Sequence, residues 1–262
     1  MTSEPVSTTA VVEDLPHLQE LVGITRDMVS TLRRRAKPKA PERFVLVFAT
    51  KAMQTAQAIV LLYQGGLSLE AQSLVRVLFE VSVSFDAFLR LLRDDPKAAC
   101  QRVLDAMMLE KIKQQRASNF AGRELVAGAP GPQELDSKER DIASRYSASE
   151  LKSLRKNGFS GISVEDRARQ AGAEEYYDIV YRNFSRNVHG SDFNELMLAN
   201  DPSMVADRRA DLFEARDGVA LDAAFIALFL VSDQVNRGFG LGQDERLAGV
   251  ARARKQKSQD QR

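Results

Sequence analysis

The sequence predicts an all-α protein: a helical bundle with an additional peripheral helical region. Apolar residues recur at spacings of three and four along most of the chain, as in helices that bury one face. Glycine and proline fall between these periodic stretches, where helices end. The chain shows no strand-hairpin pattern and no internal repeat.

Composition excludes several classes of protein. A chain of 262 residues, 44% hydrophobic and 28% charged, is long enough to form a sizeable core. Its net charge of +1 means that any nucleic-acid contact must come from a local patch. The single cysteine, Cys100, excludes an intramolecular disulfide and a zinc site built from cysteines. The two histidines lie far apart in the sequence, so we expect no metal and no cofactor.

The ends of the chain predict a cytoplasmic protein without a membrane partner. The N-terminus lacks the order of segments found in a signal peptide. The longest apolar run, residues 223–231, is too short to span a bilayer and is flanked by Asp222 and Asp233. We expect a flexible tail over 1–12, a single domain over 13–243 and a basic, disordered tail over 244–262.

The first three helices are predicted over residues 14–35, 42–64 and 68–93. Pro38 and Pro41 separate the first two, Gly65 and Gly66 end the second, and Ser68 can cap the third. A basic cluster closes the first helix: Arg33, Arg34, Arg35, Lys37 and Lys39. It is either a solvated helix end favoured by the helix dipole or a contact for phosphate, and both interpretations stay open.

The third helix is apolar around most of its circumference, yet it carries Arg76 and Glu80 four residues apart on one face. Charges in such a helix are costly unless they are paired or used. Either they form an intrahelical ion pair at a partly open seam, or they face the helix of His189 and orient it. Both interpretations place the two residues at an interface.

The later helices follow from similar signals. A long helix is predicted from Pro96 to Val126, before the break AGAPGP at 127–132. Residues 133–156 are charged and weakly amphipathic, which indicates one peripheral helix or a broken pair. Ser163 with Asp166 resembles a cap for a short helix that ends at Gln170. The last strong helix covers 217–239.

The segment 174–196 carries the candidate site. In a regular helix, Asp178, Arg182, Ser185, Arg186 and His189 would share one face. The opposite arc, expected to face the core, consists of Tyr177, Val180, Tyr181, Phe184 and Val188. The polar face is either a solvated surface or a reactive surface that looks into a cleft.

The residue types on this face suit metal-independent cleavage of a phosphodiester. The chain has no GxSxG elbow and no second histidine nearby in the sequence, so Ser185 is a poor candidate nucleophile. It also has no phosphate-binding glycine loop. A histidine can move the proton of a ribose 2′-hydroxyl, and an arginine can neutralise the charge that builds on phosphorus.

Two segments carry a resemblance to known families. Arg182 and Asn183, followed by His189, fit the arginine–polar–histidine signature of the HEPN superfamily of helical ribonucleases and toxins. LVRVLFE (74–80) with YRNFSRNVHG (181–190) resembles an uncharacterised bacterial family known only as a domain of unknown function. The resemblance covers about residues 44–195. At 191, where some toxin branches carry a modifiable tyrosine, this chain has Ser191.

The HEPN resemblance implies a small helical bundle that forms a homodimer, acts on RNA and serves in antiviral defence or a toxin system, with a possible regulatory protein partner. It implies His189 as general acid and base, Arg182 as the group that stabilises charge, and Glu80 with Arg76 as their support. The residues that would position RNA are Asn183, Ser185, Arg186, Asn187 and Tyr181. The alternative is a non-enzymatic interaction or nucleotide-sensing module, in which the Arg/Glu/His set is a structural polar network.

Overall fold

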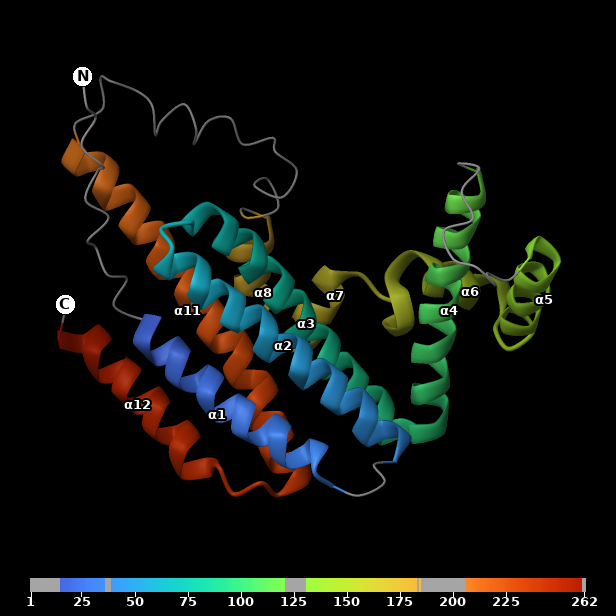
Figure 1. Ribbon diagram of the computed structural model, residues 1–262, viewed down its shortest axis with the longest axis horizontal. Helices are drawn as coiled ribbons and strands as arrows, with labels where there is room; N and C mark the ends of the chain where they lie inside the picture. The colour runs from blue at the N-terminus through green and yellow to red at the C-terminus, as the bar shows by residue number, and fades with distance from the viewer. Residues whose placement is uncertain (1–14, 36–38, 121–130, 183, 185–205, 261–262) are drawn as a thin grey trace. The chain divides into compact units, whose positions relative to one another are not determined.

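The computed structural model of the protein describes residues 15–35, 39–120, 131–182, 184 and 206–260 (Figure 1). Regular secondary structure in these ranges is helical, without a strand, which confirms the all-α fold class. In chain order the elements are α1 (Leu15–Arg33), α2 (Ala40–Gln64), α3 (Ser68–Asp94), α4 (Pro96–Phe120), α5 (Pro132–Ala143), α6 (Ala148–Asn157), η1 (Gly158–Ser160), α7 (Val164–Gln170), α8 (Glu174–Tyr176), η2 (Tyr177–Arg182), α11 (Ala206–Phe239) and α12 (Asp244–Asp260).

These helices form two compact units. Unit 1 comprises Met1–Phe85 and Gly172–Arg262, and unit 2 comprises Asp86–Ala171. The single domain that we expected over 13–243 remains a prediction. The boundary lies inside α3, where the sequence has no proline, glycine or change of composition to mark it.

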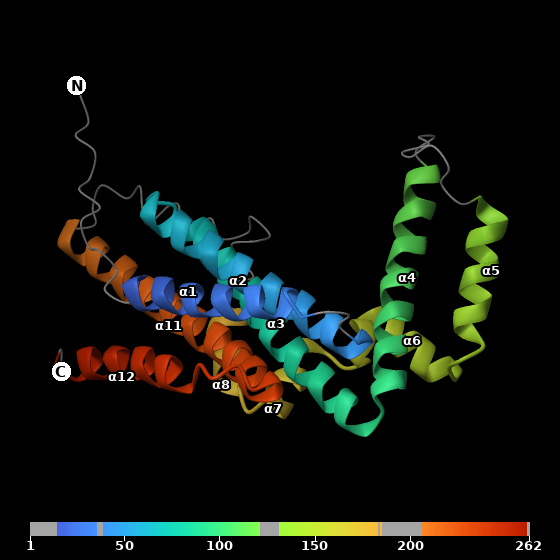
Figure 2. The same cartoon turned by 60° about the horizontal axis from the view of Figure 1, so that its bottom comes forward.

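In unit 1, α1, α2 and α11 pack against one another, and α12 lies along α1 and α11 (Figures 1 and 2). On α2, Ala49, Ala52 and Ala56 recur at helical spacing and are completely buried. Such small side chains let neighbouring helices approach closely. The rings of Phe48 and Phe85, with centroids 5.6 Å apart, join α2 to α3.

We expected a disordered tail over 244–262, but the structure has a helix, α12, over Asp244–Asp260. Its Leu247 and Val250 are buried in unit 1 (2% and 1% exposed). Arg254 pairs with Asp222 of α11 and lies over the ring of Phe225, 4.7 Å from its centroid. The apolar stripe of α12 is narrow, and the charged composition of this segment therefore hid an ordered helix.

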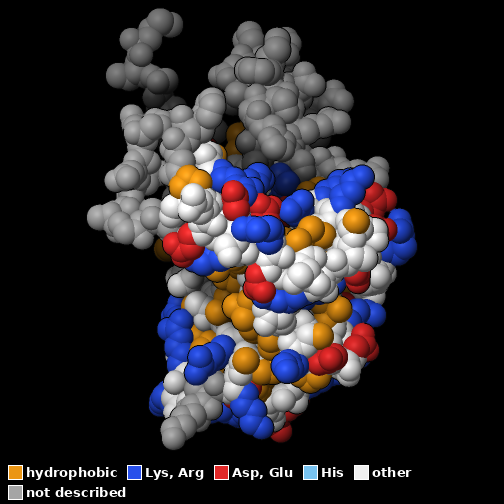
Figure 3. Space-filling view, turned by 90° about the vertical axis from the view of Figure 1, so that its right-hand side faces the viewer, with side chains coloured by type: hydrophobic (Ala, Val, Ile, Leu, Met, Phe, Trp, Pro, Cys, Tyr) orange, Lys and Arg blue, Asp and Glu red, His pale blue; other side chains and the backbone are white. Residues whose placement is uncertain are grey.

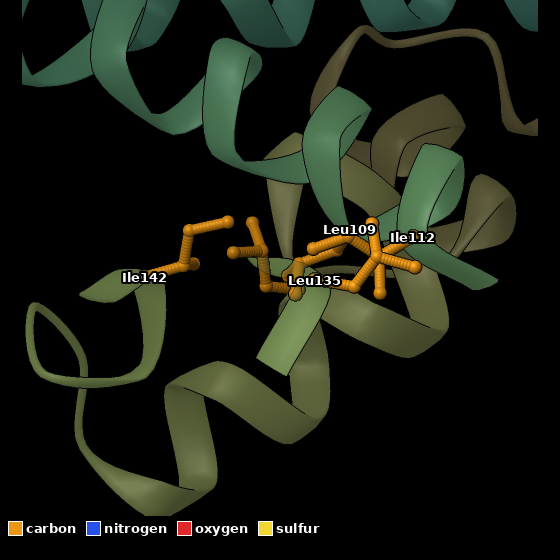
Figure 4. Close-up of a cluster of buried hydrophobic side chains, with 5 residues drawn as sticks. Leu109, Ile112, Leu135 and Ile142 are labelled. Carbon is orange, nitrogen blue, oxygen red and sulfur yellow. The ribbon is translucent and has the colours of Figure 1, made fainter. Parts of the chain in front are cut away.

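Unit 2 has a small apolar core of its own. Its buried members are Leu109 and Ile112 of α4, Leu135 and Ile142 of α5, and Leu154 of α6. The four labelled in Figure 4 gather between the ribbons of their helices. The charged stretch 133–156 is thus a broken pair of helices. Ser147 separates them by capping α6: its hydroxyl accepts from the backbone N–H of Glu150 at 3.3 Å.

A buried carboxylate ties α4 to the turn after α5. Asp105 accepts hydrogen bonds from Arg145 (2.6 Å), the Tyr146 hydroxyl (2.9 Å) and the Gln101 amide (2.9 Å). Burial, and then the hydrogen bond to Asp105, raise the pKa of Tyr146 to about 12. The phenol therefore stays protonated and remains a donor at neutral pH.

Ion pairs between opposite charges line the outside of unit 2. Arg116 of α4 reaches Asp136 and Glu139 of α5, both at 2.6 Å, and Glu139 also pairs with Arg155 of α6. Figure 3 shows basic and acidic side chains interspersed on the face it displays, rather than one patch of a single sign. On this face, the distribution does not favour binding of a polyanion by bulk charge.

Two helices are long and apolar enough to cross a membrane by length and composition alone. They are α2 and the Arg216–Phe239 part of α11, each with a mean hydropathy of 1.6. Core helices pass the same test, and both of these helices pack within unit 1. The absence of a membrane partner remains a prediction.

The core of unit 2 gives a first test of the fold. Leu135→Ala removes a fully buried side chain (1% exposed), and we expect the free energy of unfolding of unit 2 to fall by about 2–5 kcal/mol. Met107→Ala, at a position 61% exposed, is the control and should change it by less than about 0.5 kcal/mol. Urea unfolding followed by circular dichroism measures both, and equal losses would contradict this packing.

Candidate functional site

Of the predicted site residues, the structure describes the side chains of Arg76, Glu80 and Tyr181. For Arg182 it describes only the backbone, as the last residue of η2. The other predicted positions lie outside the described residues: Asn183, Ser185, Arg186, Asn187 and His189. The described part of the site therefore precedes His189 in the chain.

The chain enters this region through a π-helical turn. One short α-helical turn, α8, leads directly into η2, where the hydrogen bonds run from i to i+5. Such turns are rare and occur often at functional sites. A wider turn also changes which residues share a face, so the regular-helix positions that we assigned to Asp178 and Arg182 do not apply within η2.

The core-facing arc is confirmed in part. Val180 and Phe184 are buried, at 0% and 2% exposed. Tyr177 and Tyr181 are half-buried, and their rings stack with centroids 4.9 Å apart and planes within 15°. Val188, the last predicted member of the arc, lies outside the described residues.

Arg76 connects α3 to this turn. Its Nη2 lies 3.2 Å from Glu80 Oε1, and the same nitrogen donates to the Tyr181 hydroxyl at 3.1 Å. The Arg76 guanidinium carbon also lies over the Tyr181 ring, 4.6 Å from its centroid. The two charged side chains are 17% and 36% exposed, which confirms an intrahelical ion pair at a partly open seam.

The Arg76 side chain retains hydrogen-bonding capacity. Its Nε is buried and has no hydrogen-bond partner among the described residues. A buried, unsatisfied donor is costly, so its presence next to a π-helical turn makes this seam a candidate functional site.

A second polar cluster continues the same seam, and the sequence analysis missed it. Asp217 of α11 is buried and accepts hydrogen bonds from Gln72 Nε2 at 3.1 Å and from the Tyr63 hydroxyl at 3.2 Å. Gln72 lies four residues before Arg76, so Gln72, Arg76 and Glu80 form one row along α3. The sequence feature that could have revealed this cluster is Gln72, a glutamine in a mostly apolar helix.

Burial controls the electrostatics of this cluster. Desolvation raises the pKa of the Asp217 carboxyl, while the hydrogen bonds from Gln72 and Tyr63 and the charge of Arg216 oppose that rise. Desolvation, followed by the charge of Asp217, raises the pKa of Tyr63. The Tyr63 phenol therefore stays protonated and donates to Asp217.

Helix α11 also reaches the segment that carries the predicted motif. The guanidinium of Arg216 lies 5.7 Å from the ring centroid of Phe184, two residues beyond Arg182. Side chains from α3, α11 and η2 therefore converge around the start of this motif. Within the described ranges, no group of three or more His, Cys, Asp or Glu residues is placed to hold a metal ion.

The pH dependence of stability tests the description of Asp217. An acid with a higher pKa in the folded state binds its proton more tightly there, so the free energy of unfolding falls as pH rises from about 4 through the folded pKa. Above that pKa the contribution is constant. Asp217→Asn keeps an oxygen acceptor and should remove this fall. Urea unfolding between pH 4 and 7 measures it, and an unchanged pH profile would contradict the burial of this carboxylate.

Comparison with known proteins identifies a family. A family model, described as a family of unknown function (DUF5677), matches residues 42–204. No curated protein and no solved structure matches the chain. The matched range runs from α2 through η2 and includes the row on α3 as well as Arg182 and His189. Because the match covers more than half of its length, the chain belongs to DUF5677, a family whose function is unknown.

Proposed function

We propose that this protein is a HEPN-like, metal-independent endoribonuclease. It works in the cytoplasm as an effector of antiviral defence or of a toxin system, under the control of a regulatory protein partner. RNA is the substrate, and no metal or cofactor takes part in the reaction.

One contact supports this proposal most directly. Arg76 donates a hydrogen bond to Tyr181, the residue immediately before Arg182. The Arg76–Glu80 pair thus lies against the turn that leads into the predicted arginine–histidine motif. A pair that supports catalytic groups on another helix has to make this kind of contact.

The proposed reaction is an internal transfer of the phosphodiester. His189 takes the proton of the ribose 2′-hydroxyl, whose oxygen attacks phosphorus as the bond to the 5′-oxygen breaks. The leaving 5′-oxygen receives a proton, and the products end in a 2′,3′-cyclic phosphate and a 5′-hydroxyl. Arg182 neutralises the charge that develops on the phosphoryl oxygens.

The remaining residues position these groups. Glu80 and Arg76 orient the motif through the turn at Tyr181. Asn183, Ser185, Arg186 and Asn187 hold the RNA backbone by hydrogen bonds and charge. The cleft is completed where two copies of the motif helix meet, so the active form is a homodimer.

Cleavage of mixed cellular RNA in the presence of EDTA tests the activity. We expect the wild-type protein to produce 2′,3′-cyclic phosphate ends and His189→Ala to be slower by about 10²–10⁴-fold, because the proton transfer is lost. Circular dichroism of both proteins is the folding control. Equal cleavage by both proteins would refute the role of His189, and a strict monomer in size-exclusion chromatography would refute the homodimer.

A non-enzymatic module is the second candidate, and a specific observation favours it. Two of the polar residues in the row on α3 make their contacts within the protein, to Tyr181 and Asp217. Such a network can fix the positions of helices without any chemistry. In that case the Arg/Glu/His set is structural, and the protein binds a partner or senses a nucleotide.

Arg76→Ala separates the two candidates. If the network is structural, the free energy of unfolding should fall by about 2–4 kcal/mol and neither protein should cleave RNA. If Arg76 supports catalysis, kcat should fall about tenfold or more while stability changes by less than about 1 kcal/mol. Exposed Lys51→Ala is the control for loss of a positive charge in unit 1. Cleavage assays and urea unfolding are run on the same samples.

A further inference from the structure

We propose that the end of unit 1 at which α1 ends and α2 begins binds the phosphate backbone of the RNA. The surface consists of a basic cluster: Arg33, Arg34, Arg35 and Lys39. This inference rests on the proposed ribonuclease function and goes beyond it, because it adds a binding surface outside the arginine–histidine motif. The cluster also lies outside the range 42–204 that the family model matches.

Three helices meet at the basic cluster. Arg33 is the last residue of α1, and its Nη2 donates to the Thr50 hydroxyl of α2 at 3.4 Å. Arg35 Nη2 donates at 2.8 Å to the backbone carbonyl of Phe239, the last residue of α11. The guanidinium carbon of Arg35 also lies 5.4 Å from the centroid of the Phe239 ring. The cluster is therefore held at the end of the bundle where α1 and α11 end and α2 begins (Figure 1).

Positive charge is concentrated in residues 33–43. This stretch has six basic residues and one acidic residue, Glu42, and thus a net charge of +5. The whole chain has a net charge of +1, so the rest of it is net negative. The Glu42 carboxylate accepts from the backbone N–H of Lys39 at 2.8 Å, at the start of α2. The stretch therefore has too few acidic groups to balance its own cations.

The arginines of the cluster lack the carboxylate partners that other arginines of the protein have. Arg116 and Arg246, for example, each lie within 2.8 Å of a carboxylate oxygen. Within the described part of the chain, Arg33, Arg34 and Arg35 donate only to uncharged oxygens, a hydroxyl and two backbone carbonyls. Those bonds hold the guanidinium groups in place but leave their charge unbalanced, and most of their N–H donors remain for a ligand.

The helix dipoles account for only a small part of this charge. The C-terminal ends of α1 and α11 each carry about half a negative elementary charge, and the N-terminal end of α2 carries about half a positive one. Together they supply about −0.5, against +5 for residues 33–43. A solvated helix end therefore explains about one of these cations. The excess charge forms a surface for an anion.

The arrangement favours a chain of phosphates over a single anion. Guanidinium groups bind phosphate oxygens through pairs of parallel hydrogen bonds. Cations spread over the ends of two helices can contact successive phosphates of one strand, whereas a small anion is limited to its nearest cations. RNA is the polyanion that the proposed reaction requires, and phosphate contacts carry no base preference. The basic cluster thus raises affinity and leaves the chemical step to the motif.

Binding of a labelled single-stranded RNA tests the proposal. It is measured by fluorescence anisotropy between about 50 and 200 mM salt, in EDTA, on the full chain carrying His189→Ala. The cluster variant adds Arg33→Gln, Arg34→Gln and Lys39→Gln and keeps Arg35, which is bonded to α11. We expect its affinity to fall about tenfold or more. The slope of log K against log salt should become shallower by about 2, because each lost phosphate contact to a single strand removes about 0.7.

A triple variant elsewhere on the surface is the matched control. Lys111→Gln, Lys152→Gln and Arg252→Gln remove the same charge from exposed positions in α4, α6 and α12. They should change the affinity by less than about twofold. Equal losses in both triple variants would overturn the proposal, because the effect would then come from net charge. An unchanged salt slope in the cluster variant would overturn it too, and so would the absence of RNA binding at the lowest salt concentration.

A charge-preserving variant separates binding from a structural role. Arg33→Lys with Arg34→Lys keeps both positive charges and loses the planar geometry of the guanidinium groups. It should keep the salt slope of the parent chain and bind within about threefold of it. A slope as shallow as that of the cluster variant would mean that the substitutions disturb the end of α1, and it would overturn the proposal. Circular dichroism of every variant is the folding control.

Vesicles of anionic phospholipid distinguish RNA from a membrane surface. The proposal predicts that the cluster variant and the parent chain sediment equally with such vesicles. Sedimentation that the cluster variant loses, together with unchanged binding of RNA, would overturn the proposal and assign the cluster to a membrane.

The outcomes separate this inference from the proposed function. With His189 restored, the cluster variant should have a raised KM and an unchanged kcat, because the cluster lies outside the reacting groups. Cleavage with an unchanged KM would refute the binding surface and leave the ribonuclease intact. Binding through the cluster without any cleavage by the wild-type protein would refute the ribonuclease and leave an RNA-binding module.

Discussion

The contact between Arg76 and Tyr181 is the interaction on which the arrangement of the candidate site depends. A guanidinium in a mostly apolar helix loses hydration on folding, and that loss must be offset by partners. Here Glu80 comes from the same helix and Tyr181 from a segment more than a hundred residues later. The partners that this arginine requires therefore join η2 to α3.

The same helix repeats this arrangement one turn earlier. Gln72 reaches Asp217 of α11, four residues before Arg76 reaches η2. One row of polar side chains on α3 thus forms hydrogen bonds with two different segments of the chain, α11 and η2. The apolar core of unit 1 supplies most of the stabilisation, whereas these contacts select one relative placement of the helices.

Local signals allowed much of the fold to be predicted from the sequence. The helix ends at Gly65, Ser68, Pro96 and Gln170 agree with the structure within a few residues, because caps and breakers act over one turn. The periodicity of α3 likewise revealed Arg76 and Glu80 as a pair at an interface. Caps, breakers and periodicity each depend on residues that are close together in the sequence, and they can therefore be predicted from it.

Features that depend on distant partners escaped the prediction. Asp217 attracts notice only once Gln72, 145 residues away, is placed beside it. Helix α12 needed the surface of α1 and α11 to bury two residues of its narrow stripe. The π-helical turn leaves no mark in the periodicity of so short a segment, and the unit boundary falls within a continuous helix.

The carboxylate of Asp222 has a consequence for how this protein can be shortened. It binds Arg254 of α12 and accepts a weak hydrogen bond from Tyr176, the residue directly before η2. Proteolysis that removes α12 would leave this half-buried anion without its arginine and would expose the apolar ring of Phe225. Through Asp222, the last helix thus stabilises the residue that precedes the π-helical turn. An affinity tag should therefore be added after residue 262 and should not replace α12.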